Sequence, residues 1–499
     1  MMSLVDNLPD DIADKSLRPY GYNQVFRRDL KRFASFAVGF SFISITTGIF
    51  TTYGTVLGAG GPLGIWTWPI SVIGQLFVAL VFASLSSRMP IAGYSYQWMS
   101  RLANPKIGWL IGWVAFTFLI VVTVSVDYAI ASVTLPDLFN FTATPFNEWL
   151  ITAFILVIQL VLILFSTKWS TRINNTAVGT EVVGIVGLTL LLLIVGIIRG
   201  GIHFDHLFSM GTVSATGYFN LGTLTSVGPF MFSFLLGAYT IVGFEAAANL
   251  AEETQDAHNV VPFAMWSAVL LSGVVGFFFL VVLNLTSGNI AALTRSGTPV
   301  ADIVTQTLGT VVGDIFLVLV TFSIFACGMV AFITATRLVW AMSRDERFPG
   351  YQLFQRVDPH THTPLASTIM CGVLMEVVLA VFSTQPGTLT NLFSASSLLP
   401  VIIYMATVIL YILTRHRLPP ALRFTLGVFE WPVIILALVW LLFELSIFRD
   451  ASFSTPWLYS LVMVGIGLLY FVYLWIARPQ VLQVASLNKE EPEISGAEL

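Results

Sequence analysis

The stretch SITTG, residues 44–48, decides how this chain folds, because it puts a serine, two threonines and a glycine inside an apolar run. The surrounding residues 33–57 are long enough to cross about 30 Å of hydrocarbon as a helix. A glycine weakens a helix by about 1 kcal/mol, and in lipid a freed backbone group is tolerated only where it faces a cavity or a ligand. Residues 44–48 therefore predict an interrupted membrane helix.

A second stretch of this kind lies five apolar runs further along the chain. Residues 237–243 read GAYTIVG, again in the middle of an apolar run. Either stretch alone could equally let neighbouring helices pack closely through its glycines. As a pair they fall in the first and sixth runs, where an inverted repeat of two five-helix halves places two broken helices around a central binding site.

The composition of the whole chain indicates an integral membrane protein. Of its 499 residues, 56% are hydrophobic and 10% are charged, whereas a water-soluble domain carries about 25% charged residues. Twelve apolar runs are long enough to cross the membrane, at 33–57, 63–86, 107–134, 147–166, 176–198, 225–250, 262–286, 310–336, 364–382, 388–413, 429–448 and 456–477. We therefore expect an all-α protein of twelve transmembrane helices, with a 5+5 inverted repeat, broken helices 1 and 6, and two further C-terminal helices.

These runs divide the chain into five parts. We expect an N-terminal tail at 1–32, a first five-helix repeat at 33–198, a second at 225–413, helices 11 and 12 at 429–477, and a C-terminal tail at 478–499.

The basic residues predict the orientation of the chain in the membrane. Of the 23 Lys and Arg residues, only Arg199, Arg295 and Arg449 fall in the loops on one side. Because positive charge in short loops is retained in the cytoplasm, both tails are predicted to be cytoplasmic. A short polar tail and few loop insertions favour a bacterial inner membrane.

Four motifs resemble those of the amino acid, polyamine and organocation (APC) transporter superfamily. They are TTGIF at 46–50, PIAGYSY at 90–96, GFE at 243–245 followed by AEET at 251–254, and RDERFP at 344–349. Their order and spacing extend the resemblance over some 300 residues. The resemblance implies a secondary transporter in which the two broken helices hold the substrate.

Within that superfamily the chain is most similar to the branch of GABA, choline and related amine permeases, through GYNQ at 21–24, Arg27-Arg28 and the stretch 53–62. Two positions depart from the pattern. Ser84 replaces an acidic residue near the end of helix 2, and DAHN at 256–259 replaces Asn-Pro-x-Arg. These departures put in doubt any gating role of the family residues at those positions.

The two interruptions supply the predicted substrate-binding residues. The N-terminal ends of half-helices favour a carboxylate, and their C-terminal ends favour a cation. We expect the pocket to be lined by backbone groups, hydroxyls and one ring from Thr46, Thr47 and Gly48 of helix 1 and from Tyr239, Thr240 and Gly243 of helix 6. The resemblance implies that these are the positions that hold the amino and carboxylate groups of amino acids in relatives. Tyr239 could instead serve ordinary helix packing.

Asp127 is a further substrate-binding candidate, because an ionisable residue in hydrocarbon is costly and is therefore a functional candidate by default. It lies nine residues before Pro136, near the middle of the membrane. A carboxylate there could pair with an ammonium or quaternary amine. The alternatives are a buried aspartate bonded to hydroxyls such as Thr123 or Ser125, or one that faces away from the site.

Glu181 in helix 5 and Glu245 in helix 6 are candidates for proton coupling. Each lies about 10 Å from the cytoplasmic edge of its predicted helix. A carboxyl group in low dielectric can exist in either protonation state near physiological pH and so can carry or sense a proton. In several relatives a lysine of helix 5 takes the place of a coupling sodium. In this chain the nearest candidate for that position is Glu181, and because its charge has the opposite sign, Glu181 could also bind a cation. A structural hydrogen bond is the alternative for both residues.

Other classes of function fit less well. No Gly-Lys pair occurs, which excludes a P-loop, and the small net charge of −4 argues against a nucleic-acid partner. A channel or a membrane-embedded enzyme is a remote alternative. No cofactor and no metal site are expected, since neither His203 and His206 nor His360 and His362 have an apparent third ligand. The predicted function is import of a small amino acid or amine across the lipid bilayer with a proton, with exchange or sodium coupling as alternatives.

Overall fold

The structure is a computed structural model that describes residues 17, 20, 22, 24–165, 167–359, 361, 363–384, 387–420 and 423–483. Within these residues the chain is all helical, and one isolated bridge joins Leu30 to Thr254. Most of the predicted N-terminal tail and residues 484–499 of the predicted C-terminal tail lie outside the described residues. The expected all-α membrane fold is confirmed.

In the described ranges, eleven helical segments are long and apolar enough to cross a membrane. The first is formed by α1 (Arg32–Ile43) and α2 (Ile45–Gly60) together. The others are built on α3 (Thr67–Arg88), α5 (Pro105–Ala129), α7 (Pro145–Phe165), α8 (Thr167–Arg199), α12 (Ala257–Thr286), α15 (Thr310–Arg344), α17 (Leu365–Phe382), α18 (Thr388–Thr414), α19 (Glu430–Ile447) and α20 (Ser454–Ala477).

The remaining predicted crossing, the sixth, is divided into short pieces. It consists of α9 (Pro229–Phe232), α10 (Leu235–Thr240), α11 (Ala246–Asn249) and the 3₁₀ turn η5 (Ala251–Glu253). Short helices that the hydropathy pattern did not predict lie between the crossings, among them α4 (Tyr94–Leu102), α14 (Pro299–Leu308) and α16 (Tyr351–Phe354).

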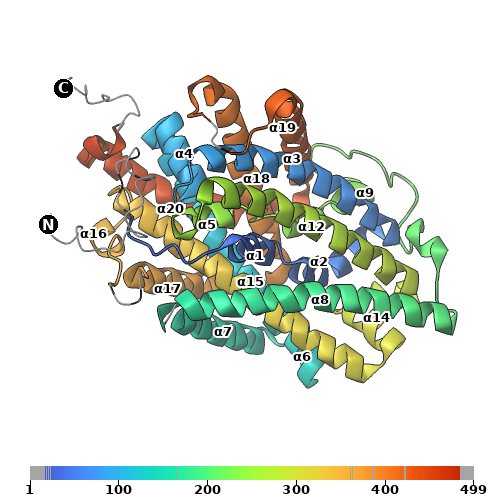
Figure 1. The fold of residues 1–499 in the computed structure, drawn as a ribbon. Coiled ribbons are helices and arrows are strands. Elements are labelled where there is room, and N and C mark those ends of the chain that lie inside the picture. Colours follow the sequence, from blue (N-terminus) through green and yellow to red (C-terminus); the bar gives the residue numbers. More distant parts are fainter. Residues whose placement is uncertain are drawn as a thin grey trace, which may run out of the picture.

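The long helices lie side by side, and helices of the same rank in the two five-helix sets pack on each other (Figure 1). The second helices α3 and α12, the third helices α5 and α15, and the fourth helices α7 and α17 are all in direct contact. In the first of these pairs, Trp68 of α3 donates from Nε1 to the Gly273 carbonyl of α12 at 2.8 Å. The helix α1, which ends where the first crossing is interrupted, lies inside this arrangement and contacts α8, α12 and α15.

Two details differ from what the sequence predicted. The fifth crossing was expected from residue 176, but α8 begins at Thr167, because hydropathy detects the apolar part of a helix and not its polar first turns. From its place four residues before the end of its predicted helix, the sequence predicts that Glu444 extends to the membrane surface. In the structure Glu444 is fully buried between α19 and α3. There its carboxyl oxygens accept from Nε2 of Gln75 at 3.0 and 3.2 Å.

Candidate functional site: the pocket between the two helix interruptions

Helix 1 breaks at Ser44, as the sequence predicted. This residue has φ 34° and ψ 94°, outside the helical region, and α2 starts at the next residue. Its backbone still donates to the Phe40 carbonyl and accepts from the Gly48 N–H, both at 3.0 Å. Its Oγ accepts from the Thr47 N–H at 3.3 Å. The bend therefore leaves these backbone groups bonded inside the protein.

Glu181 of α8 binds the start of α2. Its Oε1 accepts from the Thr46 N–H at 3.0 Å, from the Thr46 hydroxyl at 2.9 Å and from the Ser44 hydroxyl at 3.2 Å. Glu181 is only 3% exposed. The N-terminal end of a helix carries partial positive charge and unpaired N–H groups, so a carboxylate there is favourable. The chain's own glutamate thus occupies the place that the sequence analysis assigned to a substrate carboxylate.

Helix 6 breaks at residues 241–245, between α10 and α11. Gly243 has φ 81°, a backbone conformation that favours glycine. Its N–H donates to the Tyr404 hydroxyl at 2.9 Å. That hydroxyl donates in turn to Oε2 of Glu245 at 2.6 Å. One tyrosine of α18 therefore connects the predicted substrate residue Gly243 to the predicted coupling residue Glu245.

The two interruptions meet at Gly48. A Cβ atom at this position would lie 2.0 Å from Oγ1 of Thr240, closer than any real contact. Thr240 donates its hydroxyl to the Leu236 carbonyl at 2.6 Å, which holds it in this rotamer. Glycine at position 48 therefore allows α2 to touch α10.

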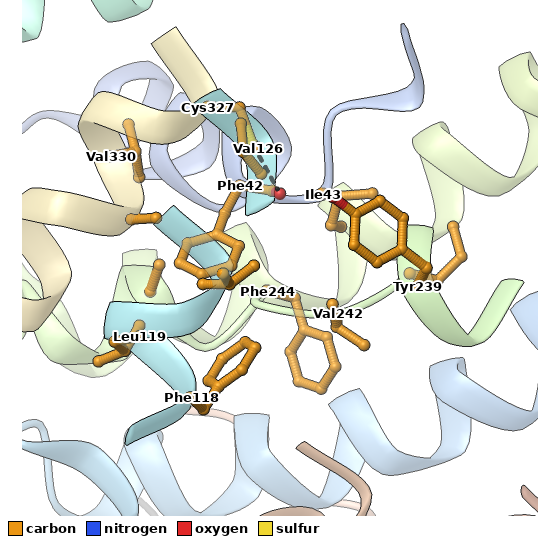
Figure 2. Close-up of a cluster of buried hydrophobic side chains, with 14 of the residues drawn as sticks. Phe42, Ile43, Phe118, Leu119, Val126, Tyr239, Val242, Phe244, Cys327 and Val330 are labelled. Carbon is orange, nitrogen blue, oxygen red and sulfur yellow. Dashed lines mark hydrogen bonds between the residues drawn. The ribbon is translucent and has the colours of Figure 1, made fainter. Parts of the chain in front are cut away.

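A small closed cavity lies where the two broken helices meet. Its volume is about 10 Å³, enough for one water molecule at most. Figure 2 shows part of its wall, with Phe42, Tyr239 and Cys327 contributed by different helices. The thiol of Cys327 donates to the Phe42 carbonyl at 3.3 Å. The lining residues are Phe42, Ile43, Thr47, Gly48, Val122, Val126, Tyr239, Thr240, Val242 and Cys327.

Four of the seven predicted substrate residues line this cavity: Thr47, Gly48, Tyr239 and Thr240. The structure places the other three differently. Thr46 is bonded to Glu181, and Gly243 is bonded to Tyr404. Asp127 is fully buried behind the wall, where Oδ1 accepts from Nε2 of Gln159 at 2.8 Å.

The apolar part of the wall could not be foreseen from the sequence. Phe42, Val122, Val126 and Val242 are ordinary residues of apolar runs, and nothing in their type marks them as pocket residues. Only their position within one or two turns of an interruption, or on a helix that faces it, could have indicated them.

The face that carries the N-terminal segment is closed by buried ion pairs. Three of the motifs that resemble the APC superfamily meet at Glu252, which is fully buried. Both of its oxygens accept from Arg344 at 3.0 Å, and Oε1 also accepts from the Ala92 N–H at 3.1 Å. Arg337 pairs with Glu253 beside it.

The N-terminal segment takes part in this closure. The Tyr22 hydroxyl donates to Asp345 at 2.5 Å, and the Arg344 guanidinium lies 3.5 Å from the centre of the Tyr22 ring. Burial, with a contribution from the Asp345 carboxylate, raises the pKa of Tyr22 above its usual 10.0, so its hydroxyl is a neutral donor at physiological pH. Gly21 and Asn23 of the same motif lie outside the described residues.

The opposite face is closed by uncharged groups. Tyr53 of α2 donates to Oδ1 of Asn284 at 2.6 Å, and Nδ2 of Asn284 donates to the Pro62 carbonyl at 2.8 Å. The loop before α9 covers the end of α2, where the Tyr218 hydroxyl donates to the Gly60 carbonyl at 2.6 Å. The pocket is therefore shut from both sides.

None of the described histidines lines this pocket. His203 and His206 lie in the loop after α8, and Asp205 brings a third potential ligand that the sequence analysis missed. Two of these three residues are exposed, and Nδ1 of His206 is bonded to the Ser287 hydroxyl at 2.8 Å, so nothing connects the group to the pocket. His360 and His362 lie outside the described residues.

An apolar helical bundle with two interrupted helices around a closed internal pocket is the architecture of a membrane transport protein. Residues 30–469 match the family described as amino acid permease. The chain belongs to this family, as its resemblance to the APC superfamily implied.

Known proteins of similar sequence are also transport proteins. The amino-acid permease BAT1 of Arabidopsis thaliana is 27% identical over 458 residues, covering 86% of this chain and 87% of that protein. The low-affinity putrescine importer PlaP of Escherichia coli K12 is 26% identical over 330 residues, covering 65% and 69%. These names agree with a permease and not with an enzyme.

A solved structure shares the fold. The manganese transporter of Eremococcus coleocola superposes with a TM-score of 0.54 at 13% sequence identity, covering 90% of this chain and 95% of that one. At this identity the likeness concerns the fold alone.

The contact between Gly48 and Thr240 predicts a pair of compensating substitutions. Gly48→Ala should lower the free energy of unfolding by about 1–3 kcal/mol, the usual cost of overpacking, and Thr240→Gly in the same chain should recover part of the loss. Thermal unfolding of the purified protein measures both. Gly187→Ala is the matched control, because a Cβ atom there meets nothing within 4 Å. Equal melting temperatures for Gly48→Ala and Gly187→Ala would contradict the close contact.

The buried pair of Arg344 and Glu252 predicts a second outcome. Arg344→Gln leaves the Glu252 carboxylate buried without its cation, so the closed N-terminal face should be destabilised. Maleimide labelling of Cys327, a pocket residue, reports the opening in a Cys371→Ser background. We expect roughly a tenfold faster reaction, equivalent to about 1.4 kcal/mol. The exposed Arg356→Gln is the control, and equal rates for the two variants would exclude the ion pair as a closing element.

Proposed function

We propose that this chain is a secondary transporter that imports a small amine or amino acid by alternating access, coupled to a proton. It would lie in the inner membrane with both termini in the cytoplasm. The membership of the amino acid permease family and the relatives named as an amino-acid permease and a putrescine importer support transport of this substrate class. The closure of the pocket from both faces supports alternating access, because a substrate can enter only after one face opens.

One observation favours an amine over an amino acid as the substrate. The start of α2, where a substrate carboxylate would find unpaired N–H groups, is already bonded to Glu181. Thr47 and Gly48 of the same turn line the pocket, but their N–H groups are bonded to Ser44. The pocket is also lined by the last residues of α1 and α10, among them Phe42 and Tyr239. The C-terminal end of a helix carries partial negative charge, and an aromatic face attracts a cation. An ammonium group fits both features.

Glu181 is the residue that we propose for proton coupling. As an anion it accepts three hydrogen bonds at the bend of helix 1, and protonation would weaken its hold on the start of α2. The titratable group that faces it from α15 is Cys327. Proton binding at Glu181 would therefore loosen the bend of helix 1. Glu245, bonded to Tyr404 at the bend of helix 6, is the second candidate.

The choice between amine and amino acid can be tested with two ligands that share a four-carbon chain. Putrescine carries an amine where GABA carries a carboxylate. A ligand that binds the folded protein at one hundred times its dissociation constant adds about 2.7 kcal/mol of stability. We expect putrescine to raise the melting temperature more than GABA at equal concentration. A larger shift with GABA would show that the carboxylate is recognised after all.

Proton coupling can be tested with Glu181→Gln in proteoliposomes. In the unmodified protein an inward proton gradient should accelerate uptake of labelled putrescine, and the glutamine, which cannot release a proton, should remove that acceleration while preserving binding. Glu245→Gln is the matched comparison. Gradient-driven uptake that persists in Glu181→Gln would transfer the role to Glu245. Uptake that responds to sodium alone, or only to substrate on the other side, would favour symport with sodium or exchange.

A further inference from the structure

Asp127 lies directly behind the wall of the pocket. Val126 of α5 and Cys327 of α15 both line the cavity, and the next residue on each helix, Asp127 and Gly328, meet behind it. A Cβ atom at Gly328 would lie 2.2 Å from Oδ1 of Asp127. The absence of a side chain at position 328 thus makes the space that the Asp127 carboxyl group fills.

The carboxyl group is bonded on one side only. Its Oδ1 accepts from Nε2 of Gln159 at 2.8 Å, and the same nitrogen donates to the Phe325 carbonyl at 3.1 Å, which fixes the orientation of the amide. Two oxygens in this group, Oδ2 of Asp127 and Oε1 of Gln159, are buried and have no hydrogen-bond partner in the described part of the chain.

Among the residues that the structure describes, no cation balances this carboxyl group. The titratable side chains that act on Asp127 in the described part of the chain are Glu376 of α17, Cys327 of α15 and Tyr239 of α10. None of the three is positively charged in any protonation state. Asp127 itself is fully buried. An ionised carboxylate in such surroundings costs far more free energy than a neutral one, and buried carboxyl groups without a cation take up a proton instead.

We propose that Asp127, Gln159 and Gly328 form a proton-binding site behind the pocket wall. The site holds Asp127 as a neutral carboxylic acid while α5 and α15 are in contact. When the two helices separate, the O–H bond breaks, the proton passes to water that enters the gap, and the carboxylate remains solvated. Asp127 is a positioning residue in this scheme, because it acts on the pocket through Val126 and Cys327. Only the link between this proton-binding site and transport rests on the proposed function.

The protonated state can be tested without any substrate. The infrared spectrum of the purified full-length protein at neutral pH should contain a carbonyl band of a neutral carboxylic acid that Asp127→Asn removes. Glu376→Gln should leave that band in place. Gln159→Leu should shift the band without removing it, because it removes the hydrogen bond to Oδ1, and this variant provides the same information if Asp127→Asn does not fold.

The outcomes that would overturn the site are distinct from failure of the proposed function. An unchanged acid band in Asp127→Asn would show that Asp127 is ionised. Stabilisation of the protein by sodium chloride over choline chloride that disappears in Asp127→Asn would show a cation site. Putrescine affinity should stay within about twofold in Asp127→Asn, and a loss of tenfold or more would place Asp127 in the substrate pocket.

Discussion

The structure depends on one constraint, that backbone N–H and C=O groups inside a membrane must find partners within the protein. Two helices are interrupted in mid-bundle, and each interruption is held by side chains from another helix. At the bend of helix 1 the Thr46 N–H donates to Glu181 of α8, and at the bend of helix 6 the Gly243 N–H donates to Tyr404 of α18. Both partner helices are the fifth of their five-helix set, so each set's last helix holds the bend that adjoins the pocket.

The two faces of the protein are closed by different kinds of interaction. Arg344 and the fully buried Glu252 form an ion pair on the N-terminal face, whereas Tyr53 and Asn284 close the other face through neutral hydrogen bonds. A buried ion pair is stable only as a complete unit, because removal of one partner leaves an uncompensated charge. A neutral hydrogen bond contributes about 1 kcal/mol and can be exchanged for water at little net cost. The N-terminal face should therefore open as a unit.

The sequence predicted the interruptions because their cause is local. Serine, threonine and glycine in an apolar run are visible without any knowledge of the neighbours, and the structure breaks both helices within or next to the predicted stretches. The direction in which a side chain points depends on helix rotation, which hydropathy does not report. Val126 lines the pocket, whereas Asp127, about 100° further around the helix, faces α7. Glu444 is buried for the same reason, because α19 turns it toward Gln75.

The two buried acids next to the pocket have opposite surroundings, although both were candidates for the same general reason. Glu181 receives three hydrogen bonds and lies at the positive end of α2, which stabilises its anionic form. Asp127 receives one hydrogen bond from a neutral amide and has a buried oxygen without a partner. In low dielectric, each donor to a carboxyl group favours its ionised form and so opposes the effect of burial. Under the proposed alternating access, opening the wall would expose Asp127 to water, and a rearranged helix 1 would release Glu181 from α2. Contact with water would lower the proton affinity of Asp127, whereas loss of its donors would raise that of Glu181.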